Sequence, residues 1–525
     1  MKKKNIVLSI FIMLFVLAQT MMFSQMSSKQ VDSLVETALK KFGVAGASVG
    51  IVKDGKIIHS KGYGVISINT GEPVTKNTAF AIASNTKAFT ATALAMLVEE
   101  GKLSWDDNVI SYIPEFKMYD SYVTENFNIK DLLSHRSGLA EGVGDLMSFP
   151  DGSNFTFDDV VKCFQFFKET SSFRTKFDYN NLMYLVAGEL MERVSKMSWE
   201  QFIKTRILLP LEMNNSYTSL SQVKEKESYA FSHLNENDSL RVIESFEENI
   251  NGAAGGLYSS IEDMCKWMQV HLSKGKYGQN LEHQLFSQES LMDMWTINTV
   301  LNTKNNSRYN YHFAGYGLGW FLNDLLGNMS VMHTGGIPGM LSKVWLIPDL
   351  NFGIVILTNT SDAGGPFYSV VSKTIADNYL GLDPLNWTEI YYKQFQKRQE
   401  TGNDVTQKVW DTVKLSEHAQ VNIEDYLGIY EDKWFGKVII YNQDNQLWFR
   451  SIRSPKLNGR MYFYNENTFA IKWEDRDLQA DAFAIFDLNK EGKVQEIRMK
   501  GISPNIDFSY DFQDLQLVKT KVLKH

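Results

Sequence analysis

Cysteine is scarce in this sequence. The chain of 525 residues holds only two, Cys163 and Cys265. A disulfide framework needs more cysteines than this, and no group of Cys and His has the spacing of a zinc site. We therefore expect no metal centre and interpret the two cysteines as buried thiols, with a single disulfide as the alternative for an exported chain.

A concentrated positive charge is also absent. The formal net charge is −8, and no segment stands out as rich in lysine and arginine. Because nucleic-acid-binding proteins carry a basic patch, this balance indicates no nucleic-acid partner. Hydrophobic residues make up 44% and charged residues 22% of the chain. These proportions indicate a globular protein and exclude a disordered chain or one with many membrane spans.

One targeting signal lies at the start of the chain. Lys2, Lys3 and Lys4 precede an apolar stretch over residues 6–17, and small or polar residues follow. The pattern predicts a signal peptide over residues 1–25, too short for a comfortable membrane span. An uncleaved anchor is the alternative, and the lack of a nearby cysteine disfavours a lipoprotein. We expect the mature protein to be exported, periplasmic or secreted, without a stable membrane span.

Two groups of predicted strands flank a long helical region. Apolar residues at helical spacing predict a helix over residues 27–43, and residues 46–65 predict a hairpin with an Asp-Gly turn. Residues 79–268 are mostly helical and loop-rich, and three β-rich runs followed by a helix occupy residues 329–381. Early and late strands can share one antiparallel sheet covered by helices. We predict an α/β (α+β) sandwich with a helical subdomain.

The pattern of residues changes toward the C-terminus. Residues 384–418 are polar and helix-like, which indicates a linker. From residue 423 onward, short alternating runs separated by turns predict a small antiparallel β-barrel or sandwich. Its aromatic side chains could form a ligand face for a glycan or peptide, or a barrel core. The predicted division is a signal peptide (1–25), a main domain (26–383), a linker (384–418) and a β domain (419–525).

A Ser-x-x-Lys pattern carries the first chemical signal. It occurs three times, starting at Ser84, Ser221 and Ser273, but only Ser84 opens a long apolar helix. Side chains at i and i+3 share a helix face, so the Lys87 amine can reach the Ser84 hydroxyl. Partial burial disfavours the ammonium form, so the amine can act as a base. Backbone N–H groups at the helix end can hold an oxyanion.

Two further segments carry compatible chemistry. Tyr179 and Asn181 stand just ahead of an apolar helix. A tyrosine beside a lysine can ionise or relay a proton to a leaving group, and an asparagine amide can bind a substrate carbonyl. At the end of a β run, His333 and Thr334 precede a glycine pair.

The glycine pair itself has a predicted use. Gly335 and Gly336 let a substrate backbone lie close to the strand, and the Gly336 amide is a candidate second oxyanion donor. Each of the three motifs also has an ordinary structural explanation. Lys87 could extend from a core helix, Tyr179 could pack beside a helix end, and His333 could make a routine hydrogen bond.

Together these motifs resemble the serine β-lactamase-related family. That family includes class C β-lactamases, D-alanyl-D-alanine carboxypeptidases, D-aminopeptidases and related esterases. The resemblance covers roughly residues 28–380 and includes the phrases LLSHRSGL, GAAGGLYSSIEDMCKWM and GYGLGW. It implies a β-lactamase/transpeptidase-like fold. The C-terminal β domain resembles the lipocalin-like module that often follows this catalytic domain.

The third motif departs from the commonest family pattern. Class C β-lactamases and carboxypeptidases usually have Lys-Thr-Gly where this chain has His333, Thr334 and Gly335. A lysine there is a permanent cation for a substrate carboxylate, whereas a histidine is mostly neutral near pH 7. This chain is therefore more similar to the peptidase and esterase branches than to the drug-resistance enzymes.

The resemblance implies an exported serine hydrolase that forms an acyl-enzyme on an amide or ester, with D-amino-acid peptides, peptidoglycan-related peptides, esters and β-lactams as candidate substrates. Ser84 is the expected nucleophile, Lys87 with Tyr179 the expected base, and no metal or cofactor is expected. The amides of Ser84 and Gly336 would hold the oxyanion. An acylating penicillin-binding-type sensor, or a binding protein without efficient turnover, is the alternative. Substrate-orienting roles are expected for Asn181, His333, Thr334 and Gly335.

A second apparent triad needs a separate interpretation. Ser134, His135 and Ser137 lie within the phrase LLSHRSGL, which in this family is a structural turn between helices. The one Gly-x-Ser-x-Gly match, GASVG at residues 46–50, lies inside the predicted hairpin and not at a strand-to-helix turn, so the sequence does not favour the nucleophile elbow of an α/β-hydrolase.

Overall fold

The computed structural model describes most of the chain beyond the predicted signal peptide. The described residues are 25–223, 229–236, 239–247, 250, 252–303, 308–416, 418–419 and 421–521. The signal peptide predicted over residues 1–25 lies outside them, apart from Gln25. Within these ranges, no helix combines the length and the apolar character that crossing a membrane requires. Cys163 and Cys265 are both buried and unpaired.

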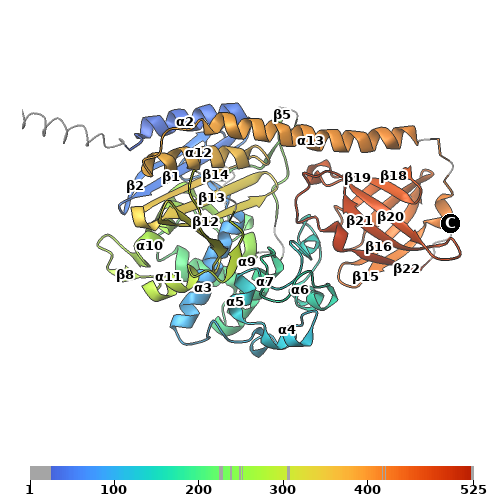
Figure 1. Cartoon of the computed structure of the whole chain (residues 1–525), viewed down its shortest axis with the longest axis horizontal. Helices are drawn as coiled ribbons and strands as arrows, with labels where there is room; N and C mark the ends of the chain where they lie inside the picture. The colour runs from blue at the N-terminus through green and yellow to red at the C-terminus, as the bar shows by residue number, and fades with distance from the viewer. Residues whose placement is uncertain are drawn as a thin grey trace, which may run out of the picture.

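An eight-stranded antiparallel sheet forms the centre of the first part of the chain, which we call the sheet domain (α2 to α12; Figure 1). Its order is β2-β1-β14-β13-β12-β11-β10-β9. The early hairpin joins the late strands where Val49 of β1 pairs with Ile356 of β14, as predicted. The strands are β1 (Gly46–Lys53), β2 (Lys56–Gly64), β9 (Thr299–Leu301), β10 (Ala314–Tyr316), β11 (Phe321–Leu325), β12 (Asn328–Ile337), β13 (Met340–Ile347) and β14 (Phe352–Thr358).

Helices cover both faces of this sheet. On β14, Ile354 and Ile356 join the core beneath α2 (Ser28–Phe42) and α12 (Gly364–Tyr379). The alternate residues of the same strand, Val355 and Leu357, join the opposite core, where α10 (Ile261–Leu272) packs. This alternation follows from the two-residue repeat of a strand and explains why β14 is apolar throughout.

The helical subdomain lies on the same side of the sheet as α10. Its central helix is α3 (Thr86–Glu99), which is buried along nearly its whole length and follows a 3₁₀ turn, η1 (Ala83–Asn85). Short strands β3 (Ala79–Ala81) and β6 (Tyr258–Ser260) pair beside η1. The other helices are α4 (Ser121–Asn126), α5 (Ile129–Leu133), η3 (Asp145–Met147), α6 (Phe157–Cys163), α7 (Leu182–Ser195), α8 (Trp199–Ile203), α9 (Gly252–Gly255) and α11 (Gln288–Met294).

The C-terminal part is a closed eight-stranded barrel. It is connected to the sheet domain by one long helix, α13 (Trp387–Leu415), which runs along the top of Figure 1. The barrel strands are β15 (Gly428–Asp432), β16 (Gly436–Gln443), β17 (Gln446–Ser451), β18 (Asn458–Asn465), β19 (Thr468–Trp473), β20 (Ala482–Leu488), β21 (Val494–Gly501) and β22 (Gln516–Lys521).

The barrel docks on the helical subdomain through both charged and aromatic contacts. Arg453 forms a paired ion contact with Asp159 of α6, at 2.7 and 2.8 Å, and also binds the Asn154 carbonyl. The rings of Phe167 and Trp434 meet at 5.3 Å. Bidentate arginine–carboxylate pairs fix orientation as well as distance, so these contacts hold the barrel in one place.

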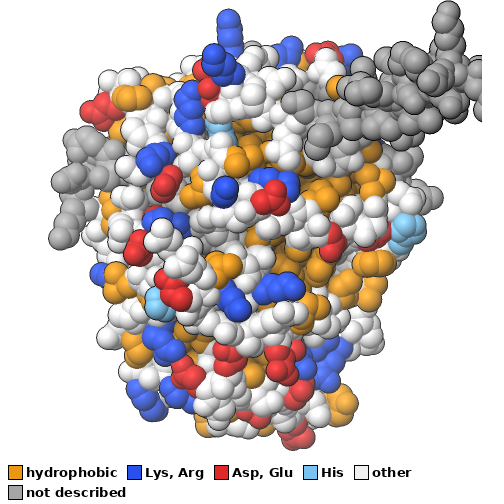
Figure 2. Space-filling view, turned by 90° about the vertical axis from the view of Figure 1, so that its left-hand side faces the viewer, with side chains coloured by type: hydrophobic (Ala, Val, Ile, Leu, Met, Phe, Trp, Pro, Cys, Tyr) orange, Lys and Arg blue, Asp and Glu red, His pale blue; other side chains and the backbone are white. Residues whose placement is uncertain are grey.

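Figure 2 shows the side of the sheet domain that faces away from the barrel. Lysine, arginine, aspartate and glutamate side chains are interspersed over this face, and neither sign forms a continuous patch. A mixed surface of this kind agrees with the modest net charge of the sequence.

A buried lysine in the sheet gives a test of the energetics of this fold. Lys343 of β13 is only 7% exposed and donates to Ser372 Oγ at 3.0 Å. Burial, with a smaller effect of Lys373, lowers the pKa of its ammonium to about 7. An unfolded lysine has a pKa of about 10.4, so the unfolded chain binds this proton more tightly and the ionisation opposes folding at neutral pH.

We predict that Lys343→Met raises the free energy of unfolding by about 2 kcal/mol at pH 7, because methionine fills the space without a buried charge. As the pH rises from 7 to 10, the unfolded lysine also begins to lose its proton. The stabilisation by Lys343→Met should therefore become smaller. Urea denaturation at both pH values measures this. Lys393, whose side chain is 73% exposed, provides the control, since Lys393→Met should change stability by less than about 0.5 kcal/mol. A less stable Lys343→Met protein would contradict the prediction.

Candidate active site

Ser84 stands at a strained turn just before the buried helix α3. The preceding residue, Ala83, has φ of 46°, a left-handed conformation that is costly for a residue with a Cβ. The sequence pattern predicts that the α-helix opens at Ser84. In the structure Ser84 lies in the 3₁₀ turn η1 and α3 begins at Thr86, because the left-handed Ala83 redirects the chain. The three-residue spacing still places Lys87 beneath Ser84.

The Lys87 amine is fully buried and touches three oxygen atoms. Its Nζ lies 3.0 Å from Ser84 Oγ, 2.7 Å from Asn181 Oδ1 and 3.0 Å from the carbonyl oxygen of Ala254. The two carbonyl oxygens can only accept hydrogen bonds. A neutral amine has two N–H groups for them and one lone pair left for the Ser84 hydroxyl proton. The geometry therefore fits a lysine that takes a proton from Ser84.

Asn181 orients this lysine. Its Oδ1 faces Lys87, and its Nδ2 donates to Asp145 Oδ2 at 2.8 Å. Both polar ends of the amide are thus engaged within the protein, whereas the sequence pattern predicts that Asn181 binds a substrate carbonyl. Burial raises the pKa of the Asp145 carboxyl to about 7, although the Asn181 hydrogen bond, and Lys87 when it is protonated, oppose the shift.

Tyr179 closes the site on one side. Burial raises the pKa of its phenol well above the usual value, and a hydrogen bond with Ser84 only partly opposes this shift. Its ring packs 4.2 Å from that of His135, and Lys87 Nζ lies 4.9 Å from the Tyr179 ring centroid. A phenol in this environment stays protonated, so of the two roles expected from the sequence the geometry favours proton relay over ionisation.

His333 is neutral in this structure. Its Nδ1 lies 2.6 Å from the Thr334 carbonyl oxygen, which can only accept, so Nδ1 carries the proton. Nε2 therefore accepts from the Tyr316 hydroxyl at 2.9 Å. Burial, with a smaller effect of Lys87, lowers the pKa of the imidazole to about 3. His333 thus fixes the backbone of β12 and supplies no positive charge at neutral pH.

Strand β12 lies directly against the turn that carries Ser84. A Cβ on Gly335 would lie 2.1 Å from the Ile82 carbonyl oxygen and 2.9 Å from the Ser84 backbone nitrogen, so only glycine allows this approach. The next residue, Gly336, is exposed to the same cavity as Ser84. Ser84 and Gly336 therefore border one space.

That space is a cavity of about 260 Å³. Six of the eight residues predicted from the sequence line it, while Lys87 lies buried behind Ser84 and Gly335 faces η1. The charged side chains among the described lining residues are the carboxylates of Glu141 and Asp507, and no lysine or arginine is present among them. Apolar walls come from Phe149, Phe177, Phe321 and Phe508.

The predicted interpretation of the LLSHRSGL segment agrees with the contacts there. Ser134 Oγ donates to the Lys130 carbonyl at 2.7 Å, and Ser137 Oγ accepts from the Leu139 amide. His135 Nδ1 accepts from the Asn180 amide at 3.1 Å. These side chains hold backbone segments together and do not form a nucleophile–base pair. Among the described residues, no group of three or more His, Cys, Asp or Glu side chains is arranged to hold a metal ion.

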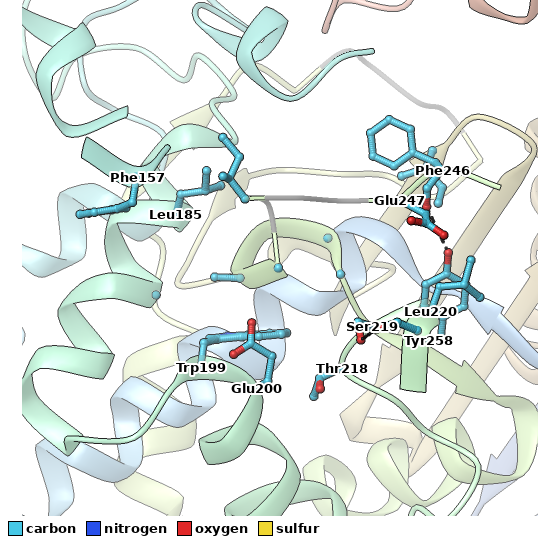
Figure 3. A pocket seen from close by; sticks show the side chains of 18 of the residues that line it. Phe157, Leu185, Trp199, Glu200, Thr218, Ser219, Leu220, Phe246, Glu247 and Tyr258 are labelled. Carbon is cyan, nitrogen blue, oxygen red and sulfur yellow. Dashed lines mark hydrogen bonds between the residues drawn. The ribbon is translucent and has the colours of Figure 1, made fainter. Parts of the chain in front are cut away.

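Figure 3 shows a second and larger cavity, of about 430 Å³, on the other side of α9. Trp199 and Glu200 lie on one side of it, and Ser219 and Leu220 lie opposite. It shares Gly255 and Ile337 with the cavity at Ser84. Its walls carry several glutamates but none of the predicted site residues, so the chemistry points to the smaller cavity.

Some parts of the site escape sequence reasoning. Asp145 contacts Asn181 but lies in none of the quoted phrases. Ala254 and Tyr316 lie in the phrases GAAGGLYSSIEDMCKWM and GYGLGW, but the sequence does not predict their contacts with Lys87 and His333. The glycines that flank Val143 just before Asp145 are the one local signal, since they mark a turn. Barrel residues 507–509 also line the cavity, and only the docked structure reveals this.

Comparison with known proteins places this geometry in a family. Residues 31–368 match the Beta-lactamase family, and residues 414–519 match a domain of unknown function (DUF3471). Protein flp of Staphylococcus aureus is 29% identical over 334 residues, which are 63% of each chain, so the match spans less than two thirds of that relative. A protein named unguisins hydrolase, from Aspergillus campestris, is 27% identical over 72% of this chain and 71% of its own.

Solved structures show the same fold. The octameric penicillin-binding protein homologue from Pyrococcus abyssi superposes with a TM-score of 0.60 over 94% of this chain and all of its own, at 22% identity. The structure of SurE superposes with a TM-score of 0.54 over 94% of this chain and 99% of its own, at 17% identity.

The close approach of Gly335 to Ser84 yields a prediction. We expect Gly335→Ala to slow reaction of Ser84 with a fluorophosphonate probe about 100-fold, because the added methyl group must push η1 away. Gly365 provides the matched control, since a Cβ there meets only Leu341 Cδ1 at 3.9 Å, and Gly365→Ala should label at the normal rate. Equal labelling of the two variants would contradict the assigned packing.

The raised pKa of Asp145 predicts that replacing this carboxyl group increases stability at high pH and decreases activity. Folded Asp145 holds its proton up to about pH 7, whereas an unfolded aspartate releases it near pH 3.9. The folded state therefore binds more protons in this window, and stability falls as the pH rises through it. We expect Asp145→Asn to be more stable than the wild type at pH 8 but not at pH 4, and to turn over about tenfold more slowly. Denaturation at both pH values, with kinetics at pH 8, checks this; a loss of stability at pH 8 would contradict it.

Proposed function

Because this chain belongs to the beta-lactamase family, we propose that it is an exported serine hydrolase that cleaves esters or amides through an acyl-enzyme on Ser84. The 3.0 Å contact between Lys87 Nζ and Ser84 Oγ carries this proposal, since it pairs a nucleophile with a buried base. The hydrolase named among the relatives supports the reaction class. The predicted signal peptide supports export.

The first half of the reaction forms the acyl-enzyme. Ser84 Oγ attacks the carbonyl carbon while its proton passes to the Lys87 lone pair. Ser84 and Gly336 line the cavity where the carbonyl oxygen becomes negative, and in this proposal their backbone amides stabilise that charge. Asn181 and the Ala254 carbonyl hold the amine in line with Ser84.

The second half releases the products. The protonated Lys87 returns its proton to the leaving oxygen or nitrogen through the Tyr179 hydroxyl, which is neutral and adjacent to Ser84. The bond between the carbonyl carbon and the leaving group then breaks. A water molecule attacks the carbonyl carbon of the Ser84 ester and gives one proton to Lys87. The bond between that carbon and Ser84 Oγ then breaks, Lys87 passes the proton to Ser84 Oγ, and a carboxylic acid is released. The original Ser84 proton has gone to the leaving group and a proton of water replaces it, so Lys87 ends the cycle neutral and water is the co-reactant.

The charges around the cavity favour one class of substrate. Glu141 and Asp507 contribute negative charge, and His333 is neutral where a lysine would pair with a substrate carboxylate. We propose that the preferred substrates are neutral or cationic acyl compounds, such as small esters and D-aminoacyl amides. Penicillins and peptides with a free C-terminal carboxylate near the scissile bond are disfavoured.

A substrate panel tests this preference. We predict that kcat/KM is at least about tenfold higher for a neutral p-nitrophenyl ester or a D-aminoacyl amide than for a chromogenic cephalosporin or a D-Ala-D-Ala peptide, because each carboxylate meets like charge. Progress curves also separate turnover from a single burst, which would identify an acylating sensor. A preference for the carboxylate-bearing compounds would reject the proposed substrate class.

Replacement of the nucleophile tests the reaction itself. We expect Ser84→Ala to lose turnover by at least about 10⁴-fold while folding normally, since the substitution removes the hydroxyl that contacts Lys87 Nζ. Ser134→Ala is the control, because the Ser134 hydroxyl donates to the Lys130 backbone carbonyl, and it should keep near-normal turnover. Equal activities for Ser84→Ala and the wild type would reject Ser84 as the nucleophile.

A further inference from the structure

A loop of the barrel forms part of the wall of the active-site cavity. This loop, residues 502–515, connects β21 to β22, and its residues Asp507, Phe508 and Ser509 line the cavity with Ser84. The Phe508 ring stands edge-on to Tyr179 at 5.9 Å. The barrel is therefore in direct contact with the proposed catalytic centre, and the question is what this contact does.

The loop rests on a glycine-rich segment of the sheet domain, residues 142–146. Gly142 and Gly144 have φ of 71° and 86°, and a Cβ on Gly142 would lie 2.8 Å from both Phe508 Cδ2 and the Phe508 carbonyl oxygen. Such left-handed glycines give the segment its turn but leave it with little intrinsic preference for one conformation. Contacts from outside the segment must therefore hold it.

This same segment holds the residues that bracket Lys87. The Gly142 amide donates to the Tyr179 carbonyl at 2.8 Å, and Asn180 Nδ2 donates to the Val143 carbonyl at 3.0 Å. Asp145 Oδ2 accepts from Asn181 Nδ2, and Asn181 Oδ1 in turn faces Lys87. Each residue from Tyr179 to Asn181 is thus bound to the 142–146 segment.

One barrel side chain binds this segment from the opposite side. The Asp511 carboxylate is fully buried and accepts hydrogen bonds from the Gly144 amide at 2.6 Å and the Leu146 amide at 2.8 Å, one on each oxygen. These two donors flank Asp145. Hydrogen bonds to a carboxylate are short and strong, and two of them fix both position and direction.

The electrostatic setting of Asp511 is costly. Burial, with additional repulsion from Asp145 and Asp514, raises the pKa of this carboxyl well above its usual value, and the two backbone donors only partly oppose the shift. The Cys163 thiol also lies in its surroundings. A neutral side chain at this position would cost less free energy to bury. The two acceptor oxygens of Asp511 therefore serve a purpose other than stability.

We propose that Asp511 of the barrel is a positioning residue for Lys87, acting through the Gly144 and Leu146 amides, Asp145 and Asn181. The inference rests on the proposed serine hydrolase function and adds to it that the barrel completes the active site. Without the Asp511 acceptors, the 142–146 segment loses its anchor, Asn181 turns, and the amine no longer points at Ser84.

Single substitutions in the full-length protein test this. Asp511→Asn keeps one acceptor and places an N–H group against the second backbone donor, so we expect kcat for an ester substrate to fall about tenfold with KM unchanged within about twofold. Asp511→Ala removes both acceptors and should lower kcat about 100-fold. Stability of Asp511→Asn should equal or exceed that of the wild type, because a buried like charge is gone.

A docking variant separates positioning from simple attachment of the barrel. Arg453→Ala removes the ion pair with Asp159 but leaves the 142–146 segment untouched, so its kcat should stay within about twofold of the wild type. Normal kcat in Asp511→Asn would overturn the proposal, as would an equal loss in Arg453→Ala and Asp511→Asn. If the wild type itself neither hydrolyses the ester nor reacts with a fluorophosphonate, the proposed function fails instead.

Discussion

The buried amine of Lys87 is the interaction on which the rest of this structure depends. It meets Ser84 from the 3₁₀ turn just before its own helix, Asn181 from the start of α7 and Ala254 from α9. Three segments far apart in the sequence therefore converge on one nitrogen. Burying a lysine amine away from water costs free energy unless its hydrogen bonds are satisfied. The surrounding fold must therefore supply each acceptor at the right distance. The helical subdomain supplies the three acceptors described here, while strand β12 and the barrel loop line the cavity beside them.

Several features that lower the stability of the fold lie around this amine. Ala83 is left-handed, Asp145 is a carboxyl group with a strongly raised pKa, and His333 is a buried neutral imidazole. Local strain and buried ionisable groups persist where function requires them and are offset by packing elsewhere. Here the offset comes from continuous apolar cores on both faces of the sheet. The concentration of cost at one place is independent physical support for a functional site there.

Local patterns in the sequence predict much of the fold and half of the site. The hairpin at residues 46–65, the apolar alternation and the Ser84–Lys87 spacing each depend on neighbours in sequence, so their signals survive in the primary structure. The orientation of Asn181 does not, because it depends on Asp145, which no motif marks. The barrel contacts of Asp511 depend on how two distant parts dock, and this information is spread over interface residues such as Phe167 and Trp434.

Peptide mapping after reaction with a fluorophosphonate tests the central claim most directly. Trypsin releases residues 77–87 as one peptide, which contains Ser84 and ends at Lys87. The account predicts that mass spectrometry finds the label on Ser84 in this peptide, and that Lys87→Met loses the label while keeping its fold. A label on Ser134 or Ser137, or full labelling of Lys87→Met, would contradict a serine activated by this buried amine.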